Sequence, residues 1–391
     1  MLWSADPWFS WVYRGITIFA LSGCFFLLRI ILFTRYYKKN MVTYSVIICI
    51  LFAFMTLFMI RVRNGGLIEI LNFVRLLVVF ILVLTMTNDE KKDIVSMTTN
   101  LYAWIVGVSI VGYVLLLAGV NMPYSIIEKP DSLFYPPFEN YGAFILLSHD
   151  GRLGDFQRFQ SVFTEPGHLG TISAILLYIN KYDLKLKSVL VIFIGTLLSL
   201  SFAAYALVGL GYLIFIMAKS KQIHKTILKI GMVTVLVVSL GAYFYVRYPE
   251  SVFSIMILGR LGFDESSGDI LAERTRGHVS HFYETQFLSS TENILWGVDL
   301  SEAQRFALFG RGGSNSYRVF LINNGIISVI ILFLMYFSIV AITPSKLGFG
   351  LLFLCSISFM QRIQTPLWEM QLFLFIGAVQ CFFSKDIAFV K

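Results

Sequence analysis

Two polar segments of this otherwise apolar chain place arginine close to a carboxylate or an imidazole. The first begins at Arg158 and reaches Glu165, which immediately precedes Pro166. The second reads Glu273-Arg274-Thr-Arg276-Gly-His278-Val-Ser-His281. Guanidinium groups bind phosphate oxygens two at a time, and a carboxylate or imidazole can take a proton from a hydroxyl group. The two segments therefore predict a site that binds an anion and also carries carboxylate and imidazole groups.

Glu165 would present a carboxylate that is fixed at the membrane surface and faces a pocket. Pro166 fits the first turn of a helix, so Glu165 is equally explained as a helix cap that the helix dipole stabilises. If the second segment is helical, Arg274, His278 and His281 share one face and form a titratable anion site. Zinc would need a third ligand, and no HExxH or CxxC pattern supplies one, so we expect no metal.

The elements that must position these residues are membrane spans. Of the 391 residues, 57% are hydrophobic and only 14% are charged, and a soluble domain carries about a quarter charged residues. The apolar residues fall in runs of about 20, long enough to cross a bilayer. Lipid offers the backbone no hydrogen-bond partner, so these runs must be helices. The prediction is an all-α polytopic membrane protein, residues 1–391 forming a single integral membrane domain.

About eleven transmembrane helices can be drawn along the chain. The runs are 10–33, 41–60, 66–87, 98–120, 166–181, 187–199, 201–218, 227–246, 314–342, 347–361 and 367–383. Residues 187–218 are too few for two ordinary spans, so they form either one long helix or two short helices that meet inside the protein. Ser199 and Ser201 mark the expected break.

Lysine placement predicts the orientation, because cytoplasmic loops carry the excess of positive charge. Every lysine except Lys129 falls on one side when the eleven runs alternate. That side is the cytoplasm, so the N-terminus lies outside and the C-terminus inside. Two large loops, 121–165 and 247–313, are then outer loops. The short cytoplasmic loops offer too little chain for a nucleotide or cofactor site.

Arginines show the opposite bias and map to the outer side or to outer helix ends. Arginine offers a planar fork of donors that suits phosphate, whereas lysine acts as a point charge. An outer pocket for a lipid-linked phosphate or pyrophosphate explains the bias, and pairing with the outer carboxylates is the alternative. The arginines expected to bind the pyrophosphate are Arg158, Arg274, Arg276 and Arg318.

The remaining composition excludes other classes. The formal charge of +8 is distributed as a membrane protein requires and does not indicate nucleic-acid binding. All four cysteines fall inside apolar runs, so no disulfide is expected. No GxxxxGK[ST] phosphate loop occurs.

The order of several short motifs resembles one family. Arg158 followed by Phe163-Thr-Glu165-Pro166-Gly167 is similar to the start of a middle span in bacterial O-antigen polymerases and the related O-antigen ligases. Later parts of the chain resemble the family's second outer loop in the order of their motifs. These parts are Arg276, then Asn293-Ile-Leu-Trp-Gly297, Gly310-Arg-Gly-Gly-Ser314-Asn315-Ser-Tyr317 and Asn324-Gly325-Ile-Ile. The resemblance covers about residues 158 to 340. The ligases carry a histidine where Ser314 stands, which favours a polymerase, and Ile294 stands where the family's turn has proline.

The resemblance implies a glycosyltransferase of the GT-C-like, lipid-linked-sugar type in a bacterial cytoplasmic (inner) membrane, with its active site facing the periplasm. Its substrate would be an undecaprenyl-pyrophosphate-linked oligosaccharide, and the growing chain would pass to a hydroxyl of the next lipid-linked unit. In that reaction Glu165 would be the first candidate for the general base, and His278 or His281 the second. A chain-length regulator and a flippase of the same pathway are the expected partners, and no cofactor is expected. The alternatives are an O-antigen ligase acting on lipid A-core, a transporter of lipid-linked oligosaccharide, and a non-catalytic scaffold.

Overall fold

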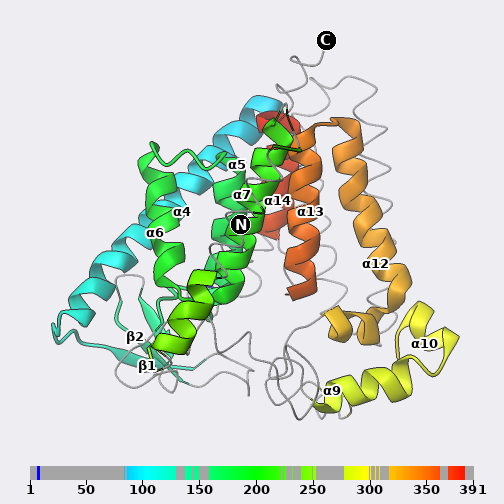
Figure 1. The fold of residues 1–391 in the computed structure, drawn as a ribbon, viewed down its shortest axis with the longest axis horizontal. Helices are drawn as coiled ribbons and strands as arrows, with labels where there is room; N and C mark the ends of the chain where they lie inside the picture. The colour runs from blue at the N-terminus through cyan, green and yellow to red at the C-terminus, as the bar shows by residue number, and fades with distance from the viewer. Residues whose placement is uncertain are drawn as a thin grey trace, which may run out of the picture. The chain divides into compact units, whose positions relative to one another are not determined.

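The chain forms two compact units in a computed structural model, and within its described part it is mostly helical (Figure 1). One unit comprises Met97–Arg274, and the other comprises Met1–Ser96 with Thr275–Lys391. The described residues are 7–8, 83, 86–128, 137–142, 145–148, 158–220, 222, 224–225, 231, 239–248, 250–251, 277–298, 300, 304, 308, 317–361 and 369–383. The first two predicted runs, and nearly all of the third, lie outside them.

Helix α4 (Asn88–Leu117) begins ten residues before the run predicted at 98–120. Its start is a capping box: the Thr87 amide donates to Glu90 Oε2 (2.7 Å), and the Glu90 amide donates to Thr87 Oγ1 (3.3 Å). Asp89 and Glu90, in the first turn, also interact favourably with the positive end of the helix dipole. The polar residues ahead of the apolar run are therefore helical.

The outer surface of α4 is apolar and its buried face carries polar groups. Met97, Trp104 and Val111 are 69%, 56% and 63% exposed. On the buried face, the Tyr102 hydroxyl donates to the Leu169 carbonyl (2.9 Å), and Ser109 shares a hydrogen bond with another serine, Ser161 (2.7 Å). A helix on a soluble protein shows the reverse pattern.

The same polarity and the lengths of the helices assign the chain to the helical membrane class. Exposed apolar residues recur at helical spacing on α12 (Tyr317–Ile342), at Ile326, Ile330, Leu334 and Phe337. Within the described residues, α4, α7 (Phe202–Lys219) and α12 are long and apolar enough to cross a membrane. An apolar exterior around an interior that carries hydrogen-bonded polar groups is the arrangement that lipid favours.

Helices α5 (Pro166–Ile179), α6 (Lys187–Leu198) and α7 pack side by side in one unit (Figure 1). Near the starts of α5 and α7, a Cβ added to Gly170 would lie 2.2 Å from the Ala204 Cβ. Just beyond the end of α5, the Tyr182 hydroxyl donates to the Val208 carbonyl of α7 (3.2 Å). The two helices therefore run parallel and contact each other through small residues. Helix α6, which lies between them in the sequence, runs in the opposite direction.

The structure resolves the open choice for residues 187–218, because α6 and α7 are two helices. They are separated at the predicted place, by Ser199, Leu200 and Ser201. Both serines are buried, and Ser201 caps α7 by accepting a hydrogen bond from the Ala204 amide (3.4 Å). Leu200 has a φ of 43°, which reverses the chain.

A small antiparallel sheet lies in the predicted first outer loop. Its strands are β1 (Ser125–Ile127), β2 (Phe138–Asn140) and β3 (Leu146–Ser148), in that spatial order. The sequence analysis did not predict these strands. The Leu146 amide of β3 donates to the Ser161 carbonyl (2.8 Å), so the sheet is attached to the segment that leads into α5.

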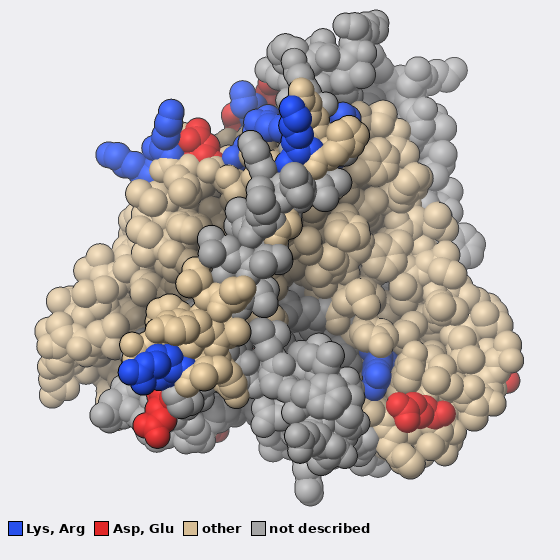
Figure 2. Space-filling view, viewed as in Figure 1, with Lys and Arg blue, Asp and Glu red and all other residues tan. Residues whose placement is uncertain are grey.

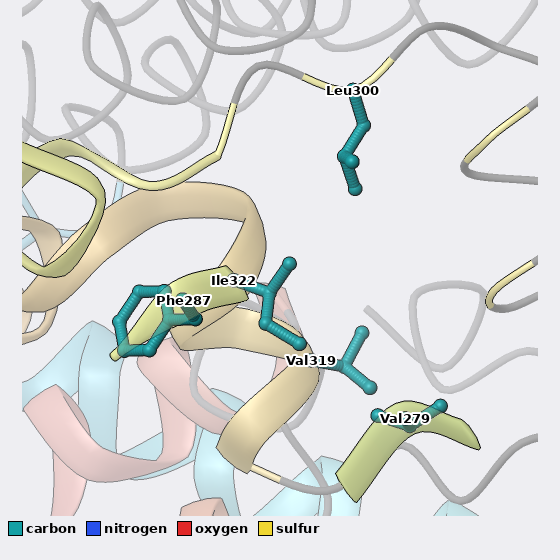
Figure 3. Packing of buried hydrophobic residues seen from close by; sticks show 5 residues of the cluster. All are labelled: Val279, Phe287, Leu300, Val319 and Ile322. Carbon is teal, nitrogen blue, oxygen red and sulfur yellow. The ribbon is translucent and has the colours of Figure 1, made fainter. Parts of the chain in front are cut away.

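The other unit contains short helices followed by long ones. The short helices are α9 (Gly277–Phe282), the π-helix η6 (Tyr283–Phe287) and α10 (Thr291–Trp296). They pack on the first turns of α12 through a hydrophobic cluster of Val279, Phe287, Leu300, Val319 and Ile322 (Figure 3). Helices α13 (Lys346–Gln361), α14 (Glu369–Gly377) and the π-helix η8 (Ala378–Phe382) follow, in the ranges predicted for the last two runs.

Two glycines with positive φ angles allow α10 and α12 to approach each other closely. Gly297 ends α10 with a φ of 87°, and Gly325 interrupts α12 with a φ of 69°. A Cβ added to Gly325 would lie 2.2 Å from the Leu295 carbonyl oxygen, and the Val298 amide donates to the Ile322 carbonyl (2.7 Å). The two segments that resemble family motifs at 293–297 and 324–327 are therefore in direct contact.

Candidate functional site

Arg158 binds the end of helix α6. Its Nε donates to the Ser199 carbonyl (3.4 Å), and its Nη2 donates to the Leu200 carbonyl (3.1 Å). The last carbonyls of a helix lack partners within the helix, and a cation is favourable beside them. The predicted phosphate-binding arginine is thus fixed, half-buried, at the break between α6 and α7.

Glu165 is the N-cap residue of α5, and Pro166 occupies the first position of that helix, as the sequence predicts. The Glu165 backbone is extended, and its side chain does not cap the amides of α5. The residue is half-buried. His168, one turn further, is buried with its Nδ1 3.1 Å from Thr164 Oγ1, which gives this imidazole a structural contact within the same segment.

The N-termini of α5 and α7 lie together at the end of the unit that holds Arg158. Each N-terminus carries a partial positive charge, which favours a bound anion. Lysines lie at the other end of the same helices: Lys181 and Lys185 in the α5–α6 turn, Lys187 at the start of α6, and Lys219 at the end of α7. In Figure 2, basic side chains around this turn stand out at the upper left.

Strained backbone surrounds Arg158. Ser161, three residues later, has a φ of 54°, and Leu200, which accepts a hydrogen bond from Arg158, has a φ of 43°. Residues other than glycine rarely adopt this region, and such strain concentrates at functional sites. Gln160 is 3% exposed, and its Nε2 has no hydrogen-bond partner within the part of the chain that the structure describes. Leu200 lies at the break that the sequence predicts, whereas sequence reasoning assigned no role to Gln160 or Ser161.

Arg318 occupies a second polar cluster, in the other unit. Its Nη1 donates to Ser280 Oγ (2.7 Å), and its guanidinium lies over the Tyr283 ring, 5.4 Å from the centroid. Ser280 belongs to α9, the same short helix that carries His278 and the exposed His281. Burial raises the pKa of the Tyr283 hydroxyl and Tyr317 raises it further, while Arg318 lowers it. Arg318 is thus tied to the helix that bears both candidate histidines.

The structure divides the predicted site residues between the two units. Arg158 and Glu165 lie in one unit, and His278, His281 and Arg318 lie in the other. Arg274 and Arg276 lie outside the described residues, so their roles stay predictions. Within the described ranges, no group of three or more His, Cys, Asp or Glu residues could hold a metal ion. No family model, curated protein or solved structure matches the chain.

Proposed function

We propose that the protein polymerises lipid-linked oligosaccharide repeat units, transferring the growing glycan from its undecaprenyl pyrophosphate to the next lipid-linked unit. The observation that carries this proposal is Arg158, held by the Ser199 and Leu200 carbonyls where the N-termini of α5 and α7 lie together. A cation beside two positive helix ends suits a pyrophosphate. The order of the motifs from Arg158 to Gly325 supports the same class of enzyme.

In the proposed reaction, a hydroxyl oxygen of the acceptor sugar attacks the anomeric carbon of the donor. The bond from that carbon to the pyrophosphate oxygen breaks, and the hydroxyl proton passes to a general base. Glu165 is the first candidate for this base, and His278 or His281 is the second. Arg158 stabilises the charge on the departing pyrophosphate, and one such donor is worth about 2.7–4 kcal/mol in a transition state. Arg274, Arg276 and Arg318 are the further candidates that the sequence provides for this role.

The finer architecture is part of this proposal: about eleven spans, the GT-C-like type, and an active site on the periplasmic face of a bacterial inner membrane. Lysines at one end of α5–α7 and Arg158 at the other support that orientation. Helix α6 has 12 residues, which at 1.5 Å per residue separates Lys187 from the break by about 18 Å.

The test is surface polysaccharide from cells carrying Arg158→Ala, Arg158→Lys or Arg276→Ala, resolved on a gel. We expect long chains to disappear in the alanine variants while single-repeat caps remain. Arg158→Lys keeps the charge but loses the planar fork, so it should restore chains only weakly. The control is Arg247→Ala, which removes an exposed arginine. Protein level and monodispersity in detergent separate lost chemistry from lost folding. Unchanged ladders in folded Arg158→Ala and Arg276→Ala variants would refute the mechanism.

A transporter of lipid-linked oligosaccharide is the second candidate, because discontinuous helices with an anion-accepting end also occur at transporter binding sites. The break between α6 and α7 is the observation that favours it. Purified protein in detergent, given undecaprenyl-pyrophosphate-linked repeats, discriminates the two. Polymer formed without any compartment identifies the enzyme, and binding without polymer identifies the transporter. Added lipid A-core becomes glycosylated only if the protein is a ligase.

A further inference from the structure

The small sheet of the first loop carries a pair of tyrosines on one face. The register that pairs Ser125 with Asn140 continues outward to place Tyr124 opposite Tyr141. Their rings lie 5.2 Å apart between centroids and are tilted by 43°. Tyr124 is 50% exposed, and Tyr141 is half-buried. The sheet therefore presents an aromatic surface outside the helices.

A buried carboxylate lies beside this pair. Glu139 precedes Tyr141 by two residues, so both side chains project from the same face of the sheet. Glu139 is fully buried, and its Oε2 accepts a hydrogen bond of 2.7 Å from the Tyr141 hydroxyl. Burying a carboxylate is costly, and the Tyr141 hydroxyl meets part of the hydrogen-bonding need of Glu139. The hydrogen bond fixes the direction of the Tyr141 hydroxyl.

The hydrogen bond also determines which partners the Tyr141 hydroxyl can recognise. The phenol has one proton, which it donates to Glu139, so any further hydrogen bond to its oxygen must come from a donor. A ligand at this surface must therefore present an apolar face to the rings and a hydroxyl donor at the edge. A pyranose ring does both, because one face carries C–H groups and its rim carries hydroxyls.

We infer that Tyr124 and Tyr141 form a subsite for one sugar ring of the lipid-linked oligosaccharide, with Glu139 as a positioning residue. The inference rests on the proposed function for the identity of the ligand. The sheet adjoins the proposed phosphate site, because the Leu146 amide of β3 donates to the Ser161 carbonyl, three residues after Arg158. A sugar held on the sheet thus lies beside the segment that holds the arginine.

The test uses the full chain in lipid nanodiscs and saturation-transfer NMR. The probe is a set of lipid-free oligosaccharides of one to three repeats, released by mild acid from the polysaccharide of the source cell. We expect saturation of the pyranose ring protons, and a loss of affinity of about tenfold in Tyr124→Ala and in Tyr141→Ala, the size of one lost aromatic contact. The controls are Tyr245→Ala, an exposed tyrosine outside the sheet, and Glu128→Gln, an exposed carboxylate beside β1.

A positioning role for Glu139 predicts coupling that a purely structural role would not produce. Glu139→Gln and Tyr141→Phe should each weaken binding, and the double variant should bind no more weakly than Tyr141→Phe alone. Additive losses refute the positioning role. Wild-type binding in both tyrosine-to-alanine variants, equal loss in Tyr245→Ala, or no saturation of the wild type refutes the subsite. Failure of the polymerase proposal is read separately, as absence of polymer from purified lipid-linked repeats.

Discussion

The close approach of α5 and α7 predicts a large effect from one methyl group. In Gly170→Ala, the new Cβ would lie 2.2 Å from the Ala204 Cβ and 3.0 Å from its Cα. Ordinary contacts between such atoms are about 3.5–4.0 Å, so the helices must separate by more than 1 Å, roughly. Overpacking of this kind costs about 1–3 kcal/mol. The same movement separates the two helix N-termini that flank Arg158.

Thermal unfolding in detergent measures the effect, with polysaccharide ladders as the functional readout. We expect Gly170→Ala to lower the melting temperature by about 2 °C or more and to shorten the ladder. Gly209→Ala is the matched control, because it lies in α7 with no described atom within 4 Å of the added Cβ. Its melting temperature should stay the same or rise, since alanine is the better helix former. The double variant Gly170→Ala, Ala204→Gly should recover part of the lost stability, because the 2.2 Å contact is removed and the 3.0 Å approach to the Cα remains. A single variant as stable as wild type would disprove the close packing.

Three further predictions concern other parts of the chain. Gly325→Ala forces a side chain into a φ of 69° against the Leu295 carbonyl, so we expect about 1–3 kcal/mol of lost unfolding free energy, and an unchanged melting curve would contradict the kink. Burial raises the pKa of the Tyr182 hydroxyl above its ordinary value. The stability that the protonated hydroxyl contributes is therefore complete at pH values below the ordinary pKa, and it is lost as the pH rises through the folded-state pKa. The melting temperature, measured from about pH 8 to about pH 11, should fall less steeply with pH in Tyr182→Phe than in the wild type, and parallel slopes would contradict this. Arg318→Lys loses the geometry of the Ser280 hydrogen bond, so hydrogen exchange in α9 should accelerate, and unchanged exchange would contradict the contact.

Hydropathy and helix-end signals predicted much of the helical framework. Pro166 marks the start of α5, and the serines around Leu200 mark the break between α6 and α7, because both depend on local backbone chemistry. The early start of α4 was missed because hydropathy ignores polar helical turns. The Thr87–Glu90 capping box was the signal that would have shown it.

The sheet and the surroundings of Arg158 could not be predicted in the same way. Strands of three residues are too short to show an alternating pattern. The hydrogen bonds from Arg158 to residues 41 and 42 positions later are tertiary contacts, and so is the burial of Glu139. The arginine itself was predicted from its type and its place in a motif, whereas its partners depend on how α5, α6 and α7 pack.

The brevity of α6 has a consequence for how the chain enters the bilayer during synthesis. With 12 residues it is about 18 Å long, and the hydrocarbon layer is about 30 Å thick. Leaving the insertion machinery alone, α6 would expose the polar ends of its backbone to lipid. We therefore predict that α6 enters the bilayer together with α7 as a hairpin, and that Arg158 then binds the carbonyls of the turn between them. A nascent chain that stops before Phe202 should keep α6 accessible to water-soluble reagents, and a chain extended past Lys219 should protect it.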